Sequence, residues 1–257
     1  MKDVQGEKDT RKVPLKHVGI RELHWPLRLK DRDRGEQSTV AKISLAVDLP
    51  HDARGTHMSR FVECLQDVDI ISSLNLEVIL DDLKERLEAE KAMIDLEFPY
   101  FIYKKAPVSG FASPLDLKCA YHAEKSDKYT LKMRVDTPII TLCPCSKEIS
   151  EYGAHNQRAT ASIEVITKGL VWIEELAQIA DKGGSSKVYS LLKRPDEKKI
   201  TEEAYENPRF VEDAVREIAL LLEEHPRIVW YRVTVDSMES IHNHNAFACV
   251  EKGWDIS

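Results

Sequence analysis

The sequence predicts an α+β protein in which helices cover one face of an antiparallel sheet. Several segments alternate apolar and polar residues with a period of two, which is typical of strands buried on one face. Other segments carry apolar residues at helical spacing. In chain order these segments read strand, strand, helix, helix, strand, strand, and the same succession then follows a second time.

The predicted strands place their apolar residues on one shared face. In the first of them this face consists of Ala41, Ile43, Leu45, Val47 and Leu49. The same alternation recurs at 115–121, 129–135, 159–165 and 229–235. One face of each strand is polar or small, which suits a sheet that is covered on a single side.

Three of the helices in this succession can be located by their sequence patterns. The first carries an apolar stripe and ends near Lys91, and the second spans residues 170–180. The third begins with Asn207 as N-cap and Pro208 as its first residue. Loops are expected at 181–187 and 193–199. Residues 1–13 are predicted to be mobile, and 14–257 to form one domain of two units, roughly 15–124 and 127–252.

Composition and charge exclude several classes of protein. The net charge of −7 argues against a general nucleic-acid binder. No apolar run reaches about 18 residues, and the first residues contain no apolar segment, so neither a transmembrane helix nor a secretory signal is expected. The five cysteines form an odd and scattered set. This set argues against a disulfide scaffold and favours a reducing cytoplasm.

The residues whose side chains could ligate a metal or take part in catalysis lie mainly in two stretches. Residues 143–158 read CPCSKEISEYGAHNQR and contain two thiols and one imidazole. The stretch at 238–248, MESIHNHNAFA, brings together Glu239, His242 and His244. On an extended chain the two histidines of the second stretch would point the same way, because a single residue separates them.

These residues allow several kinds of site. A redox pair is disfavoured, because only Pro144 separates Cys143 from Cys145. A closed structural zinc site fits poorly, since that spacing is tighter than usual. A catalytic metal site needs fewer protein ligands, and a thiolate, imidazole and carboxylate set suits zinc, ferrous iron or manganese. Any single histidine is more often a surface or locally satisfied residue, and the motif GTHMSRF at 55–61 could form an anion pocket or simply cap a helix.

Six motifs in this order resemble the type IB GTP cyclohydrolase I family. They are GTHMSRF, PCSKEIS, GAHNQR, RPDEK, NPRFVEDAVRE and ESIHNHNAFA, and the resemblance spans roughly residues 14–252. It implies a tunnelling fold (T-fold) with two ββααββ units per subunit, an antiparallel sheet and helices on one face. It also implies a homo-oligomer, expected to be a tetramer, with active sites at subunit interfaces. Neither nucleic acid nor membrane is an expected partner.

The resemblance also implies an activity. Members of the family are hydrolases of cyclic amidine C–N bonds that convert GTP and water to 7,8-dihydroneopterin triphosphate and formate. This reaction is the entry to tetrahydrofolate and, in many bacteria, to queuosine. One divalent metal per site, zinc, ferrous iron or manganese, would lower the pKa of bound water towards about 7. A histidine or glutamate would protonate the departing ring nitrogen.

Residue roles follow from the motifs by the same resemblance. Cys145 would be a metal ligand and the residue most tied to activity, and His155 and Glu197 would lie in the metal environment. Glu212 would accept hydrogen bonds from the N–H groups of guanine. Glu239 and His242 would complete the site as metal ligand or proton carrier, and the sequence leaves open which of them touches the metal.

The triphosphate requires fixed positive charge, for which the sequence offers His57, Arg60, Lys147 and Arg158. Two other functions compete with the main one. The first is another tunnelling-fold enzyme that acts on a different pterin or deazapurine. The second is a non-catalytic metal-binding assembly protein, in which Cys145 and the histidines only hold the fold together.

Overall fold

The computed structural model describes residues 5–66, 68 and 70–253, which form two compact units. The N-terminal unit contains the described residues up to Pro99 together with Ala120–Met133, and the C-terminal unit contains Tyr100–Cys119 and the described residues from Arg134 onwards. Three long strands contribute residues to both units. They are β4 (Ala92–Lys105), β5 (Ala112–Lys125) and β6 (Tyr129–Leu142).

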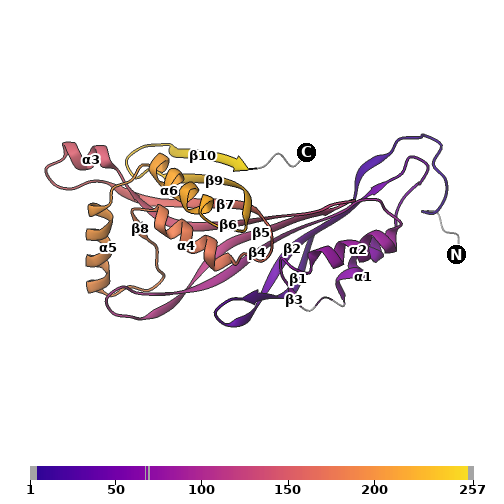
Figure 1. The fold of residues 1–257 in the computed structure, drawn as a ribbon, viewed down its shortest axis with the longest axis horizontal. Helices are drawn as coiled ribbons and strands as arrows, with labels where there is room; N and C mark the ends of the chain where they lie inside the picture. The colour runs from indigo at the N-terminus through magenta and orange to yellow at the C-terminus, as the bar shows by residue number, and fades with distance from the viewer. Residues whose placement is uncertain (1–4, 67, 69, 254–257) are drawn as a thin grey trace. The chain divides into compact units, whose positions relative to one another are not determined.

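The N-terminal unit packs two helices on a sheet (Figure 1). Its remaining elements are β1 (Leu15–Asp31), β2 (Gly35–Leu49), α1 (Met58–Gln66), β3 (Ile70–Ile71) and α2 (Leu76–Leu87). The alternation predicted for β2 is confirmed, because Ala41, Ile43, Leu45, Val47 and Leu49 are all buried. The predicted stripe of α2 is buried except at Leu87, which is half-buried, and the helix ends there, before Lys91.

A histidine on the sheet of this unit gives a prediction for stability. His122 Nδ1 donates to Asp95 Oδ1, and this hydrogen bond raises the pKa of His122 although partial burial opposes it. A raised pKa means that the pair stabilises the fold fully below the unfolded pKa of about 6.5 and loses this effect as pH rises through the folded pKa. Solvent screening keeps its contribution below about 1 kcal/mol.

We therefore expect His122→Gln to lower the free energy of unfolding more at pH 6 than at pH 8.5. Urea titration at both pH values measures this difference, with His51→Gln, a change at an exposed histidine of the same unit, as the control. An equal loss at the two pH values would show that the pair does not act through the charge of His122.

The C-terminal unit contains the other half of the elements. They are α3 (Pro144–Ile149), β7 (Asn156–Thr167), α4 (Ile173–Gly183), β8 (Ser186–Lys187), α5 (Arg194–Glu206), α6 (Val211–Glu223), β9 (Ile228–Met238) and β10 (Asn245–Gly253). Helices α4 and α6 lie side by side, and α6 packs on β9 and β10 (Figure 1). Their apolar faces meet the buried side chains of β7 and β9, which include Ala161, Ile163, Val233 and Val235.

The predicted tunnelling fold, with two ββααββ units on an antiparallel sheet, is wrong. The ten strands form one mixed sheet in the order β10-β9-β7-β6-β5-β4-β2-β1-β3, and β8 pairs with β6. Strand β3 runs parallel to β1, with Ile70 opposite Arg28 and Ile71 opposite Leu29. The described residues contain six helices, and four of these belong to the C-terminal unit, where two were expected.

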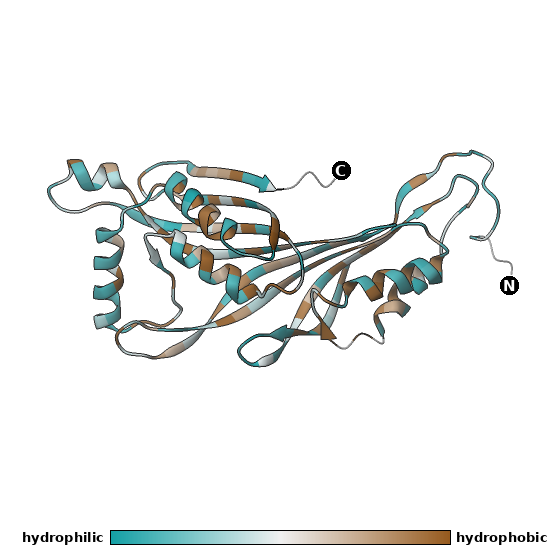
Figure 2. Ribbon diagram, viewed as in Figure 1, coloured by the Kyte–Doolittle hydropathy of each residue, from teal (hydrophilic) through white to brown (hydrophobic). Residues whose placement is uncertain are grey.

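The elements that depart from the prediction are short or polar. Strands β3 and β8 have two residues each, too few to show alternation, and α3 has only six. Helix α5 begins in the charged segment 193–199 that was predicted to be a loop, and Figure 2 shows this helix as mostly hydrophilic. The predicted N-cap Asn207 is instead the C-cap of α5, and α6 begins at Val211 with Phe210 as its N-cap.

The segment predicted to be mobile, residues 1–13, lies partly outside the described residues, which begin at residue 5. Further along this segment, Lys8 pairs with Ala53 in an isolated bridge. Within the described part of the chain, no helix has the length and apolar character that crossing a membrane would require.

Candidate active site

The segment that joins β6 to β7 is tied to both strands by its own polar groups. Cys143 is the N-cap of α3, where its Sγ accepts from the backbone N–H of Ser146 at 3.3 Å, and Pro144 begins the helix. The Cys143 N–H donates to the His155 carbonyl at 3.1 Å, and the His155 N–H donates to Ser146 Oγ at 3.4 Å. These bonds place Cys143 and His155 together at the start of β7.

A pocket of about 450 Å³ opens beside this segment, and all its walls belong to the C-terminal unit. Four separate stretches of chain line it: the end of β6, the start of β7, the first turn of α6, and the connection from β9 into β10. The lining residues are Thr141, Cys143, His155, Gln157, Arg209, Phe210, Val211, Glu212, Glu239, His242, His244, Ala246 and Phe247.

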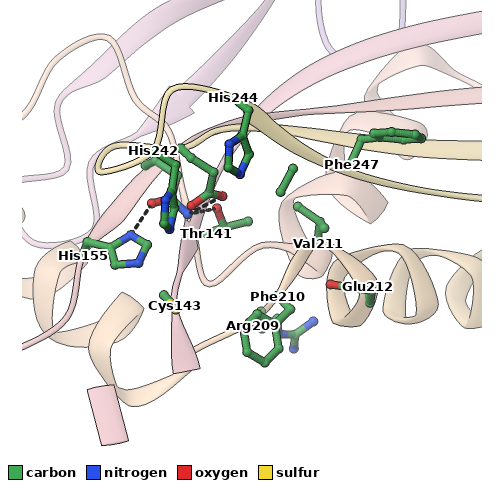
Figure 3. A pocket seen from close by; sticks show the side chains of 13 residues that line it. Thr141, Cys143, His155, Arg209, Phe210, Val211, Glu212, His242, His244 and Phe247 are labelled. Carbon is green, nitrogen blue, oxygen red and sulfur yellow. Dashed lines mark hydrogen bonds between the residues drawn. The ribbon is translucent and has the colours of Figure 1, made fainter. Parts of the chain in front are cut away.

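The four predicted site residues His155, Glu212, Glu239 and His242 meet in this pocket. Figure 3 shows His155 and His242 on one side of it and Glu212 towards the other. The His242 and His244 rings are stacked, with centroids 5.1 Å apart and planes inclined by 19°. Both histidines are exposed, so their imidazoles are accessible to a ligand in the pocket.

A hydrogen-bonded network forms the floor of the pocket. The amide of Gln157 contacts His155 Nδ1 at 2.9 Å and donates to a Glu239 oxygen at 3.2 Å. It also donates to Thr141 Oγ1 at 3.2 Å, and Thr141 is buried. His155 and Glu239 are therefore fixed relative to each other by side chains of neighbouring strands.

The opposite wall is the first turn of α6. Glu212 is the second residue of this helix and is exposed, so its carboxylate is accessible from the pocket. Acidic side chains in a first turn are favoured by the positive end of the helix dipole. Arg209 lies just before the helix, where it donates to the Gly183 carbonyl at 3.1 Å and to Asn207 Oδ1 at 3.1 Å. The wall thus presents a carboxylate beside a fixed guanidinium.

Two predicted residues lie outside the lining of this pocket. Cys145 is exposed in the first turn of α3, and the thiol that lines the pocket is that of Cys143. Glu197 is exposed in the first turn of α5. Within the described residues, no group of three or more His, Cys, Asp or Glu side chains lies close enough to hold a metal ion.

The predicted ligand set Cys145, His155, Glu197 and His242 is therefore not assembled within one chain as these side chains stand. The donors are of types that bind zinc, ferrous iron or manganese, but their placement does not match a coordination shell. The metal site stays a prediction.

Asp196, the neighbour of Glu197, is fully buried and anchors the start of α5. Its carboxylate accepts from the backbone N–H groups of Val108, Ser109 and Lys193, each at 2.8 Å, and from Ser109 Oγ at 2.7 Å. Burial alone would raise the pKa of Asp196, but these hydrogen bonds outweigh it and hold that pKa well below its usual range. The hydrogen bonds of Asp196 thus fix the start of α5, which carries Glu197, to the turn between β4 and β5.

We expect Asp196→Ala to lower the thermal unfolding midpoint, because it leaves three backbone N–H groups without their acceptor. Asp213→Ala is the control, since Asp213 caps α6 through a single backbone N–H, that of Phe210, at 3.0 Å. The loss at Asp196 should be at least about twice the loss at Asp213. Differential scanning calorimetry of both variants measures it, and equal losses would contradict an anchoring role.

The predicted triphosphate contacts are spread over both units. His57 and Arg60 belong to the N-terminal unit, where Arg60 donates to the Arg86 carbonyl at 2.6 Å. Lys147 donates to the Tyr205 carbonyl at 2.5 Å and lies 4.3 Å from the centre of its ring. Arg158 is exposed on β7.

Sequence reasoning missed several residues of the pocket, among them Gln157, Arg209, Thr141 and Phe247. Gln157 and Arg209 stand inside the quoted motifs GAHNQR and NPRFVEDAVRE, so their position next to predicted site residues was a usable signal. Thr141 carries no such signal, because it is a strand residue in an apolar segment. Phe247 lies in the motif ESIHNHNAFA but is a common residue type on any strand.

Comparison with known proteins identifies the family. Residues 1–248 match the model of a family described as type I GTP cyclohydrolase folE2. The chain belongs to this family. A GTP cyclohydrolase FolE2 of Thermotoga maritima is 60% identical over 253 residues, which is 98% of each chain. One of Dictyoglomus turgidum is 57% identical over 254 residues, 99% of each chain. The prediction of an enzyme of the GTP cyclohydrolase class is thereby confirmed.

Solved structures with a similar fold include uricases. The uricase of Arthrobacter globiformis matches with a TM-score of 0.55 at 9% identity, covering 100% of this chain and 97% of the other. A highly active mutant of Bacillus sp. TB-90 urate oxidase matches with a TM-score of 0.56 at 10% identity, covering 93% of this chain and 100% of the other. At such low identity this likeness concerns the fold of the FolE2 family member and not its chemistry.

Proposed function

We propose that this chain converts GTP and water to 7,8-dihydroneopterin triphosphate and formate. The single observation that carries the proposal is the pocket of about 450 Å³ in which three motif segments meet: GAHNQR, NPRFVEDAVRE and ESIHNHNAFA. Small-molecule sites commonly have volumes of about 300–1,000 Å³. The family supports GTP as substrate, because the relatives at 57–60% identity bear the name GTP cyclohydrolase.

Guanine recognition is assigned to the first turn of α6. A carboxylate only accepts hydrogen bonds, and the Watson–Crick edge of guanine offers two adjacent donors, the ring N1–H and the exocyclic amine. Glu212 is exposed in the pocket and can accept from both. Phe210 and Phe247 line the same pocket and offer apolar surface to the purine.

Proton transfer is assigned to the opposite side of the pocket. Opening the imidazole ring requires water to add at C8 and a proton to reach the departing ring nitrogen, which leaves C8 as a formamide. A second water then releases C8 as formate, and carbons of the ribose close the new ring with loss of one water. His155, His242 and Glu239 are the groups of this wall that can carry protons, and general acid–base catalysis of this kind contributes roughly 10²- to 10⁴-fold. Glu239 is half-buried, whereas His242 is exposed.

A divalent metal, zinc, ferrous iron or manganese, is a separate part of the proposal, and no step is assigned to it. Its support is the donor chemistry of Cys145, His155, Glu197 and His242. Metal analysis of protein purified from metal-controlled growth, combined with activity per bound metal, tests this part. Full turnover by protein stripped of metal would contradict it.

We further propose that the chain works as a homo-oligomer, expected to be a tetramer, and that its product enters tetrahydrofolate or queuosine synthesis. Cys145 and Glu197 are exposed in the single chain, so a second copy can approach both. Sedimentation equilibrium measures the assembly state, and a monomer with full activity would contradict the oligomer.

The experiment for the activity is incubation of metal-reconstituted protein with GTP. We expect formate and a fluorescent pterin in equal amounts. ITP serves as the comparison substrate. It lacks the exocyclic amine that Glu212 is proposed to bind, and should be turned over less well than GTP. Consumption of GTP without formate would exclude the cyclohydrolase reaction.

A further inference from the structure

Gln157 is not a reactive group, yet it touches two residues to which the proposed chemistry is assigned. It is the second residue of β7 and is half-buried. Its Oε1 lies 2.9 Å from His155 Nδ1, and its Nε2 lies 3.2 Å from Glu239 Oε1. An amide in this position can determine how both partners present their lone pairs.

The partners of Gln157 decide which end of its amide faces which group. A carboxylate only accepts hydrogen bonds, so the amide nitrogen has to face Glu239. The amide oxygen then faces His155, and because this oxygen only accepts, Nδ1 of His155 must carry the hydrogen. A neutral imidazole protonated at Nδ1 keeps its lone pair on Nε2.

Two buried hydroxyl groups hold the amide in place. The Gln157 amide nitrogen also donates to Thr141 Oγ1 at 3.2 Å, and that hydroxyl lies 3.1 Å from Ser237 Oγ. Thr141 can therefore accept from Gln157 while donating to Ser237. The two hydroxyls belong to β6 and β9, the strands on either side of β7, so the Thr141 hydroxyl that holds the amide is itself held from the opposite strand.

We propose that Gln157 is a positioning residue that holds His155 in its Nδ1–H tautomer, with Nε2 presented to the reaction, and that orients the Glu239 carboxylate. The effect on turnover rests on the proposed function. The tautomer of His155 does not, because it is a property of the free protein. A partner that fixes the tautomer of a functional histidine typically changes activity by roughly 10- to 100-fold when it is removed.

Two substitutions separate the functions of the amide. Gln157→Leu has a similar size and removes every polar contact. Gln157→Glu retains an acceptor for His155 Nδ1–H but places a second carboxylate against Glu239, where like charges repel. The same two changes at Gln178, an exposed glutamine of α4 in the same unit, serve as matched controls.

The first readout is the ¹⁵N spectrum of histidine-labelled protein without substrate, in which the His155 signals are identified by their loss in His155→Gln. We expect the Nδ1–H tautomer in the wild type and in Gln157→Glu. In Gln157→Leu we expect a shift towards the Nε2–H form. The Gln178 variants should match the wild type.

The second readout is the kinetics with GTP. We expect kcat to fall on the order of 10- to 100-fold in both Gln157 variants, with a much smaller change in KM, because Gln157 does not touch the proposed guanine anchor. A merely structural role would lower only the folded, active fraction of the protein, which reduces the apparent kcat and leaves KM unchanged. We therefore divide kcat by the folded fraction measured by circular dichroism; a merely structural role would then restore the wild-type kcat.

An unchanged His155 tautomer in Gln157→Leu, or a wild-type kcat in both variants, would overturn the proposal. If Gln157→Leu does not fold, the kcat of Gln157→Glu tests the proposal instead. Glutamate has the size of glutamine and retains the acceptor for His155 Nδ1–H. If the wild-type protein does not turn over GTP at all, the proposed function fails, and the spectra still decide the tautomer.

Discussion

Cys145→Ala is expected to reduce formate release from GTP by at least about 100-fold while the protein stays folded. The reason is twofold. Cys145 is exposed in the first turn of α3, so removing its thiol opens no cavity in the core. If the thiolate is a ligand or reactant, its loss should exceed the roughly 10- to 100-fold cost of removing a group that only supports a ligand.

The control for Cys145 is Cys249→Ala, which removes an exposed thiol of β10. This variant should retain wild-type turnover. Circular dichroism and bound metal per chain are measured beside the rate of formate release. Loss of fold together with metal in Cys145→Ala would favour a structural site, and wild-type turnover would remove Cys145 from the mechanism.

Glu212→Gln is the second substitution with a large expected effect. An amide in place of the carboxylate loses one of two acceptors and sets a donor against the donors of guanine. Hydrogen bonds to charged groups contribute about 1.5–3 kcal/mol, so kcat/KM for GTP should fall on the order of 10- to 150-fold. The fold should persist, because Glu212 is exposed and α6 retains its cap at Asp213.

Comparing GTP with ITP tests whether Glu212 contacts the exocyclic amine of guanine. ITP lacks the exocyclic amine, so the loss caused by Glu212→Gln should be smaller with ITP than with GTP. Glu206→Gln, at an exposed carboxylate of α5, is the matched control and should leave both substrates unaffected. Equal losses for GTP and ITP would contradict a contact between Glu212 and the amine.

The strands with long alternating patterns were predictable from the sequence, and the way they combine was not. The alternation in β2, β7 and β9 results from burial on one face, which a period-two pattern records directly. The two-residue strands β3 and β8 form by pairing with the longer strands β1 and β6, so no local sequence pattern predicts them. The start of α5 is polar and is stabilised by the distant backbone of Val108 and Ser109.

The candidate site was also predictable only in part. The motif order indicated His155, Glu212, Glu239 and His242, and the pocket contains all four. Thr141 joins them only through hydrogen bonds across neighbouring strands, and such pairing cannot be read from spacing along the chain. The two thiols of CPC also separate in space: Cys143 caps α3 and lines the pocket, whereas Cys145 is exposed outside the lining.

The most direct test of the proposed reaction follows the carbon that it removes. GTP labelled with ¹³C at C8 is incubated with the metal-reconstituted protein, and the label is followed by NMR. We expect all label that leaves GTP to appear as formate, in an amount equal to that of an unlabelled 7,8-dihydroneopterin triphosphate. Label retained in a purine or pterin product, or GTP left intact by folded and metal-loaded protein, would contradict the assignment.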